Sequence, residues 1–218
     1  MPLKINEIYY SVQGESTHAG RPCIFIRLTF CNLRCTYCDT EYAFYEGKDM
    51  EIDDIMSEIQ QWDCNLVEVT GGEPLFQEEC IDLLNELVIS KYEVMLETGG
   101  SLPISDVPKN VIKIVDFKCP SSGMEMKNLW SIVDNLQPHD EVKFVIGNRE
   151  DFYWAKEKIT EYSLDKKCTV LFSPTFGEID PQQIVGWILA ENLPVRMQMQ
   201  MHKMIWDPDK QGVWWLAI

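Results

Sequence analysis

Short apolar runs alternate with amphipathic helical patterns along most of the chain, and this alternation restricts the fold more than any other feature. We expect buried strands at residues 23–30, 65–72, 92–100, 111–118, 141–147, 168–174 and 194–202. Apolar residues at helical spacing predict helices at residues 51–62, 79–90, 126–136, 150–162 and 181–192. Strands that alternate with helices in this way form βαβ units with right-handed crossovers. The sequence therefore predicts one domain over residues 1–218 with a mostly parallel α/β sheet, either open or closed into a barrel.

Segments rich in glycine, cysteine or polar residues directly follow several of the predicted strands. A cysteine-rich stretch follows the strand at 23–30, TGGEP follows the next strand, and ETGG follows the third. In parallel α/β folds the ligands bind at the carboxyl ends of the strands. These segments are therefore expected to meet at one mouth of the sheet.

Three cysteines, Cys31, Cys35 and Cys38, lie within eight residues. Three thiolates can hold three irons of a [4Fe–4S] cluster and leave the fourth iron open to bind another molecule. A structural zinc site needs a fourth ligand, and only His18 and His202 are distant candidates. The spacing favours an iron–sulfur site. A non-enzymatic iron–sulfur or zinc-binding module is the alternative from a different class.

The charge balance limits the partners of the protein. The chain has 19 Lys and Arg against 35 Asp and Glu, a formal net charge of −16, whereas nucleic-acid binding needs a basic surplus. The sequence contains no signal-like or membrane-length apolar run. We therefore expect a cytoplasmic protein with reduced thiols. The cysteines outside the trio are expected to be small buried apolar side chains; they are Cys23, Cys64, Cys80, Cys119 and Cys168.

The CxxxCxxC spacing, with Tyr37 before the last cysteine, resembles the signature of the radical S-adenosylmethionine (SAM) superfamily. TGGEP, at Thr70–Pro74, resembles the GGE motif of that superfamily. The resemblance implies a partial (β/α) barrel, since 218 residues fall short of the ~250 typical of a full one. It also implies that the open iron chelates SAM. Reduction of the cluster then cleaves SAM to methionine and a 5′-deoxyadenosyl radical.

The same resemblance implies a set of SAM contacts at the strand ends. Glycines fit such a site because they let backbone groups approach a ligand closely. Ordinary βα turns are the alternative explanation for ETGG and for FSPTF at Phe172–Phe176. The expected SAM-binding residues are Tyr37, Gly72, Glu73, Thr98, Gly99, Asp116, Phe117, Lys118, Ser173, Pro174, Thr175 and Phe176.

Four further segments resemble the 7-carboxy-7-deazaguanine synthase family, which acts in queuosine biosynthesis. They are YYSVQGEST…GRPCIFIR (Tyr9–Arg27), CDT (Cys38–Thr40), DFKCPSSGM (Asp116–Met124) and QMHKMIWD (Gln200–Asp207). The resemblance implies that 6-carboxy-5,6,7,8-tetrahydropterin loses ammonia to give 7-carboxy-7-deazaguanine, with SAM regenerated. It also implies a Mg²⁺ ion held by the substrate carboxylate and by Thr40.

The chemistry of this implied substrate suggests candidate binding residues, because a pterin needs paired donors and acceptors along its pyrimidine edge. Val12, Gln13, Gly14 and Glu15 are expected to contact that edge, and a polar turn after a short strand is the alternative explanation for Gln13–Glu15. Arg27 lies in an apolar strand, where an unpaired charge is costly. It either clamps the substrate carboxylate or forms a buried ion pair. Thr70 and His202, the latter on the last predicted strand, are the other candidates, and a hydrogen-bonded structural histidine is the alternative for His202.

The nearest alternative enzyme is a glycyl-radical-enzyme activase, which shares the cysteine loop and the GGEP turn. Family resemblance further implies a homodimer and a reductant of the flavodoxin or ferredoxin class. The apolar end of the chain, Trp214–Ile218, is expected to cover the substrate mouth, contact a partner subunit or cap the open barrel.

Overall fold

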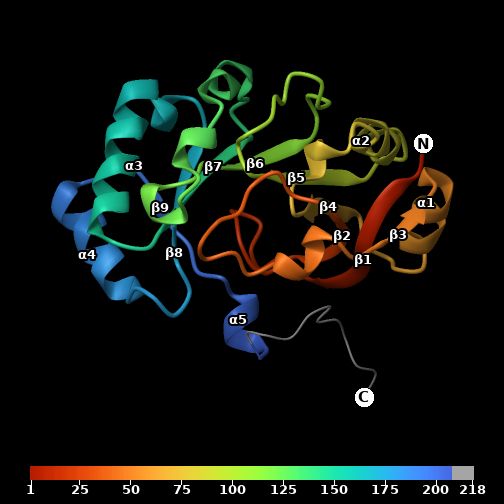
Figure 1. Ribbon diagram of the computed structural model, residues 1–218, viewed down its shortest axis with the longest axis horizontal. Helices are drawn as coiled ribbons and strands as arrows, with labels where there is room; N and C mark the ends of the chain where they lie inside the picture. The colour runs from red at the N-terminus through yellow and green to blue at the C-terminus, as the bar shows by residue number, and fades with distance from the viewer. Residues whose placement is uncertain (208–218) are drawn as a thin grey trace.

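The computed structural model describes residues 1–207, and these form a nine-stranded sheet with helices at its ends and outer face (Figure 1). The strand order is β3-β1-β2-β4-β5-β6-β7-β8-β9. The strands are β1 (Leu3–Val12), β2 (Pro22–Leu28), β3 (Lys48–Met50), β4 (Leu66–Gly71), β5 (Glu93–Thr98), β6 (Ile112–Asp116), β7 (Glu141–Ile146), β8 (Thr169–Pro174) and β9 (Arg196–Met197).

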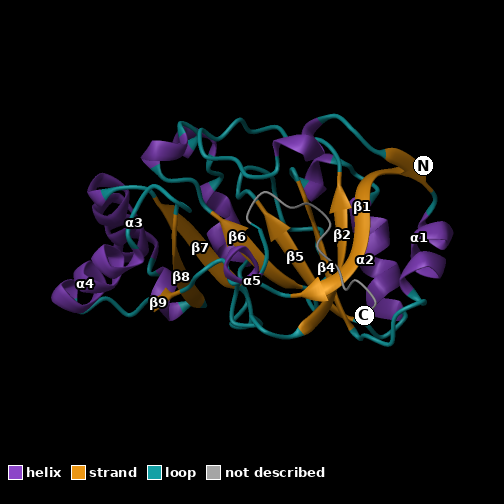
Figure 2. Cartoon of the chain, turned by 90° about the horizontal axis from the view of Figure 1, so that it is seen from below, coloured by secondary structure: helices purple, strands orange, loops and turns teal. Residues whose placement is uncertain are grey.

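All neighbours from β2 to β9 are parallel, and β1 pairs antiparallel with both β2 and β3. Within the described residues β3 and β9 are the two free edges, so the sheet is curved but not closed (Figure 2). The prediction of a mostly parallel, incomplete barrel is therefore confirmed. The predicted Trp214–Ile218 segment lies outside the described residues.

Helices α1 and α2 lie toward the β1–β4 end of the sheet, and α3 and α4 lie toward the β7–β9 end (Figure 1). The α-helices are α1 (Ile52–Ile59), α2 (Cys80–Ile89), α3 (Arg149–Tyr162), α4 (Pro181–Glu191) and α5 (His202–Ile205). Short 3₁₀ turns are η1 (Glu41–Phe44), η2 (Pro74–Phe76), η3 (Pro120–Ser122), η4 (Glu125–Lys127), η5 (Trp130–Asn135) and η6 (Leu164–Lys166). Among residues 1–207, no helix is long and apolar enough to cross a membrane.

The core lies between the helices and the outer face of the sheet. Because successive strand residues point to opposite faces, Ile24 and Ile26 of β2 join this core while Phe25 points to the inner face. Phe25 forms a smaller inner cluster with Cys23, Leu66, Met95 and Ile114. The other cysteines are free thiols; Cys23, Cys80 and Cys119 are buried as predicted, whereas Cys64 and Cys168 are only partly buried.

The helix predicted at residues 126–136 is wrong, because this segment forms only the turns η4 and η5. The side chain of Asn128 hydrogen-bonds both backbone groups of Lys118, at 2.9 Å each. The backbone N–H of Leu129 donates to the carbonyl of Gly100 at 2.8 Å. These bonds to distant loops take the place of the helical ladder, a competition to which Asn is prone.

The strand predicted at residues 194–202 shortens to Arg196–Met197, and His202 instead begins α5. The N–H of Gln198 still donates to Phe172 of β8, at 2.9 Å. Beyond it, the N–H of Met201 donates to Gly14, at 2.9 Å. The chain therefore leaves the sheet and crosses its mouth.

Candidate active site

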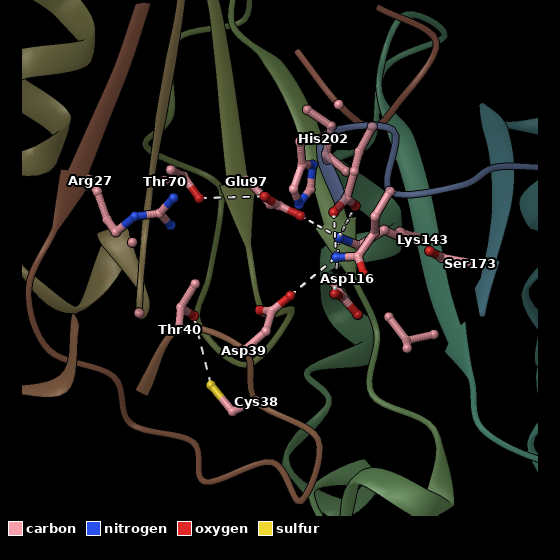
Figure 3. Close-up of a pocket in the computed structure, with 18 of the residues that line it drawn as sticks. Arg27, Cys38, Asp39, Thr40, Thr70, Glu97, Asp116, Lys143, Ser173 and His202 are labelled. Carbon is pink, nitrogen blue, oxygen red and sulfur yellow. Dashed lines mark hydrogen bonds and ion pairs between the residues drawn. The ribbon is translucent and has the colours of Figure 1, made fainter. Parts of the chain in front are cut away.

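A cavity of about 780 Å³ opens at the carboxyl ends of the parallel strands, where the sequence predicts the ligand mouth (Figure 3). Pockets for small molecules and cofactors typically measure about 300–1,000 Å³. Segments that follow β1, β2, β4, β5, β6 and β8 all contribute to its walls, together with α5. All of the predicted site residues line this cavity except Glu73 and Phe117.

Glu73 and Phe117 support the cavity wall from behind. The buried carboxylate of Glu73 accepts hydrogen bonds from the Thr98 hydroxyl at 2.9 Å and the Gly99 N–H at 2.7 Å. Phe117 is fully buried, and its ring lies 4.5 Å from that of Trp130. The side chains of Glu73 and Phe117 thus hold the turns after β5 and β6 in place and do not line the cavity.

The three cysteines lie on one loop of the cavity wall as partly exposed free thiols. The Thr36 hydroxyl within this loop donates to the Ser121 carbonyl at 2.7 Å, which ties the loop to the turn after β6. Burial raises the pKa of the Cys35 thiol to about 11. Deprotonation of this thiol at neutral pH would therefore come from a bound metal, which ionises a coordinating thiol outright.

The residues fit a [4Fe–4S] cluster. No three His, Cys, Asp or Glu side chains within residues 1–207 converge on a single metal ion. A [4Fe–4S] cube binds each thiolate through a different iron, so the three sulfurs do not have to point at one common position.

Gly72 lies directly against the cysteine loop, and a Cβ at this position would lie 2.7 Å from Cys31 Cβ.

Three buried polar atoms of the cavity region have no hydrogen-bond partner among the described residues. They are the Tyr37 hydroxyl, Asp116 Oδ1 and Thr175 Oγ1. A buried polar atom left unpaired costs free energy, so each of these atoms calls for a ligand partner. All three belong to the predicted SAM contacts, and they agree with a polar cofactor in this part of the cavity.

The guanidinium of Arg27 lies at the β2 side of the cavity and is mostly buried. Its Nε donates to Glu7 at 2.8 Å and its Nη2 donates to the Tyr9 hydroxyl at 3.1 Å. The buried ion pair that the sequence left open is therefore present. Nη1 makes no hydrogen bond within residues 1–207, so part of the guanidinium is left for a ligand.

His202 enters the cavity from the first turn of α5 and packs against Gly14. A Cβ on Gly14 would lie 3.0 Å from His202 Cγ, so the histidine ring occupies the space of the missing side chain. Burial lowers the pKa of His202 below its ordinary value. The imidazole is therefore neutral at pH 7 and can act as one donor and one acceptor.

Charged residues that the sequence analysis did not select complete the centre of the cavity. They include Lys143 of β7, Glu68 of β4 and Glu97 of β5. The signal was present, because each is a charged residue inside an apolar strand, the feature that singled out Arg27. Burial and the neighbouring Glu97 and Glu15 raise the pKa of Glu68 well above its ordinary value. Glu68 is paired with the side-chain amide of Gln13.

This environment makes the stability of the protein depend on pH through Glu68. The unfolded chain releases the Glu68 proton near pH 4.5, whereas the folded protein retains it to higher pH. The free energy of unfolding should therefore fall as pH rises above 4.5, by at most about 1.4 kcal/mol per pH unit from this group. We expect Glu68→Gln to flatten the decline measured by urea unfolding at pH 5.5, 6.5 and 7.5.

Glu93→Gln is the matched control for this measurement. Glu93 is paired with Arg21, whose hydrogen bond lowers the pKa of Glu93. Glu93 therefore titrates below pH 5.5, and its replacement should not change the slope of the unfolding free energy against pH. Equal slopes for the native protein and the Glu68→Gln variant would contradict the assignment of a neutral Glu68.

Residues 25–119 match the model of the Radical SAM superfamily, the class of protein that the open sheet and the three-cysteine loop define. Two similar curated proteins are 7-carboxy-7-deazaguanine synthases, from Koribacter versatilis and Chlorobaculum tepidum. The first is 46% identical over 97% of this chain and 100% of its own length, and the second is 45% identical over 97% and 98%. The chain belongs to the 7-carboxy-7-deazaguanine synthase family.

A solved structure supports the same fold. QueE from Escherichia coli aligns with a TM-score of 0.78 and 24% identity, over 93% of this chain and 95% of that chain. Membership of the superfamily brings a [4Fe–4S] cluster and SAM to this protein. The cysteine loop and the unpaired polar atoms described above are the residues that fit them.

Proposed function

We propose that the protein converts 6-carboxy-5,6,7,8-tetrahydropterin to 7-carboxy-7-deazaguanine with loss of ammonia, in 7-deazapurine and queuosine biosynthesis. One observation carries the proposal: a single cavity contains both the three-cysteine loop and a buried wall of carboxylate and amide groups. Such a wall matches the N–H and C=O groups along the edge of a pterin. Family membership supports the same substrate.

The cluster and SAM, when bound, supply the radical that takes a hydrogen atom from the substrate. The protein orients the pterin. Glu15 accepts hydrogen bonds from Gln200 at 2.9 Å, Gln198 at 3.1 Å and Lys143 at 2.9 Å, which fix its carboxylate in the cavity. The free edge of Arg27 is the group proposed to bind the substrate carboxylate. Radical chemistry needs no strong general base, and a closed cavity protects it from solvent.

A partner-free assay separates this proposal from a glycyl-radical-enzyme activase. The reconstituted protein, SAM and a chemical reductant are incubated anaerobically with the carboxytetrahydropterin, and the product is followed by its absorbance and mass. We expect 7-carboxy-7-deazaguanine without any added protein substrate. SAM cleavage that occurs only with a partner protein would favour the activase.

We further propose that Thr40 contributes a ligand to Mg²⁺. Thr40 lines the cavity two residues after the last cysteine, with its hydroxyl 3.7 Å from Cys38 Sγ. We expect Thr40→Ala to weaken the stimulation of turnover by Mg²⁺ about 10-fold or more. Thr40→Ser keeps the hydroxyl and should respond to Mg²⁺ as the native protein does. An unchanged Mg²⁺ titration for Thr40→Ala would overturn the assignment.

We also propose a flavodoxin- or ferredoxin-type protein as the electron donor, a homodimer as the assembly, and the cytoplasm as the location. Size-exclusion chromatography with light scattering tests the assembly directly.

A further inference from the structure

Lys143 lies at the centre of the cavity wall and contacts carboxylates from three separate segments (Figure 3). Its Nζ lies 2.9 Å from Glu15 Oε2 and 3.3 Å from Asp116 Oδ2, and it forms a closer ion pair with Glu97. The side chain is 7% exposed. An ammonium group has three N–H donors, so these partners can use all of them. Lys143 therefore acts through other residues rather than by contacting a ligand.

The three carboxylates face different parts of the cavity. Glu15 follows β1; Gln198 donates to the same oxygen that Lys143 contacts, and Gln200 donates to the other oxygen. Glu97 is the penultimate residue of β5, and its Oε2 lies 3.4 Å from the Thr70 hydroxyl. These two belong to the region proposed for the pterin.

Asp116 ends β6 and also pairs with Lys118, at 3.1 Å. Asp116 belongs to the region that fits SAM. Lys143 is therefore bonded to both halves of the site.

The three carboxylates around Lys143 need a positive charge among them. Carboxylates buried close together repel, and one of them takes up a proton unless a positive charge compensates. A protonated carboxyl donates one hydrogen bond instead of accepting it. The loss of Lys143 would therefore change the hydrogen-bonding character of the wall as well as its shape.

We propose that Lys143 is a positioning residue for the substrate. Its ammonium group compensates the charge of Glu15 and Glu97 and holds both carboxylates in place as acceptors for the N–H donors of a 2-amino-pyrimidinone ring. Through Asp116 it fixes these acceptors relative to the cofactor. The inference rests on the proposed pterin substrate and adds the group that sets the selectivity for the ring.

The test compares Lys143→Met, which keeps the length and loses the charge, with Lys143→Arg. We expect Lys143→Met to raise the KM for the pterin about 10- to 100-fold, the usual effect of losing a buried charged hydrogen bond. Iron content and SAM affinity should stay within about threefold of native, because Lys118 still pairs with Asp116. Lys143→Arg should recover part of the loss. The native protein should reject an analogue that lacks the 2-amino group, and Lys143→Met should lose this preference.

Lys113→Met is the matched control. Lys113 is a buried lysine on the neighbouring strand β6, paired with Asp140 at 3.0 Å, and it does not line the cavity. Its loss should lower stability and leave KM and the analogue preference unchanged. The inference fails if Lys143→Met behaves like this control, or if it keeps the native preference for the 2-amino group. Failure of the proposed function would look different, because the native protein itself would then not turn over the pterin.

Discussion

Replacing Cys35 with alanine is expected to abolish SAM cleavage. The three cysteines are the thiols of one cavity loop, and a [4Fe–4S] cluster with one open iron uses all of them. With one ligand lost, we expect the iron content after anaerobic reconstitution to fall well below about four per chain. Turnover should decrease about a thousandfold or more, because the loss removes the source of the radical. Iron and sulfide analysis together with 5′-deoxyadenosine detection measures both effects.

Cys168→Ala is the control for this substitution. Cys168 is also a partly exposed free thiol, but it does not line the cavity. Its replacement should leave iron content and SAM cleavage at native levels. Full iron content and native SAM cleavage in Cys35→Ala would contradict the cluster assignment. One zinc per chain without iron in the native protein would favour a zinc-binding module.

Replacing Gly72 with alanine is the second change with a large expected effect. A Cβ at Gly72 would lie 2.7 Å from Cys31 Cβ and 2.8 Å from the carbonyl carbon of Phe30. Backbone atoms cannot move aside as a flexible side chain can, so the cysteine loop itself must shift. We expect a loss of about 1–3 kcal/mol in the free energy of unfolding. SAM cleavage should fall at least about 10-fold, since small displacements of a reacting centre are costly.

Gly186→Ala is the contrasting variant, because it should raise the free energy of unfolding instead of lowering it. Gly186 lies within α4, and an added Cβ would meet no atom within 4 Å. Alanine is the better helix former there and should stabilise the protein by about 0.5–1 kcal/mol. Urea unfolding and SAM cleavage of both variants separate a steric effect at the cluster loop from a general glycine effect. SAM cleavage at the native rate in the Gly72→Ala variant would contradict the close approach of Gly72 to the cysteine loop.

The parallel part of the fold was predictable because its strands are short apolar runs bounded by glycine turns. The long β1 was not predicted as a core strand, since Lys4, Asn6 and Glu7 interrupt its apolar pattern. Its pairing with β2 and β3 comes from tertiary contacts. The same applies to residues 126–136, where Asn128 bonds a distant loop instead of supporting a helix.

About half of the cavity residues were predictable, chiefly from motifs that follow the strands. Lys143 has the same sequence signal as Arg27, a charge inside an apolar strand, but its partners were not predictable. Glu15, Glu97 and Asp116 lie far from it in sequence and meet it only in the folded protein. His202 lines the cavity, but the sequence pattern placed it on a strand, whereas α5 presents it. Residue type and strand position thus suggest membership of the site, and the partners become visible only in three dimensions.

The most direct test of the central claim is turnover with SAM as the limiting component. The reconstituted protein is supplied anaerobically with the carboxytetrahydropterin in about tenfold excess over SAM, and both SAM and product are quantified. Because SAM is expected to be regenerated, the account predicts several molecules of 7-carboxy-7-deazaguanine per SAM and little free 5′-deoxyadenosine. Absence of 7-carboxy-7-deazaguanine, whether SAM is consumed or not, would contradict it.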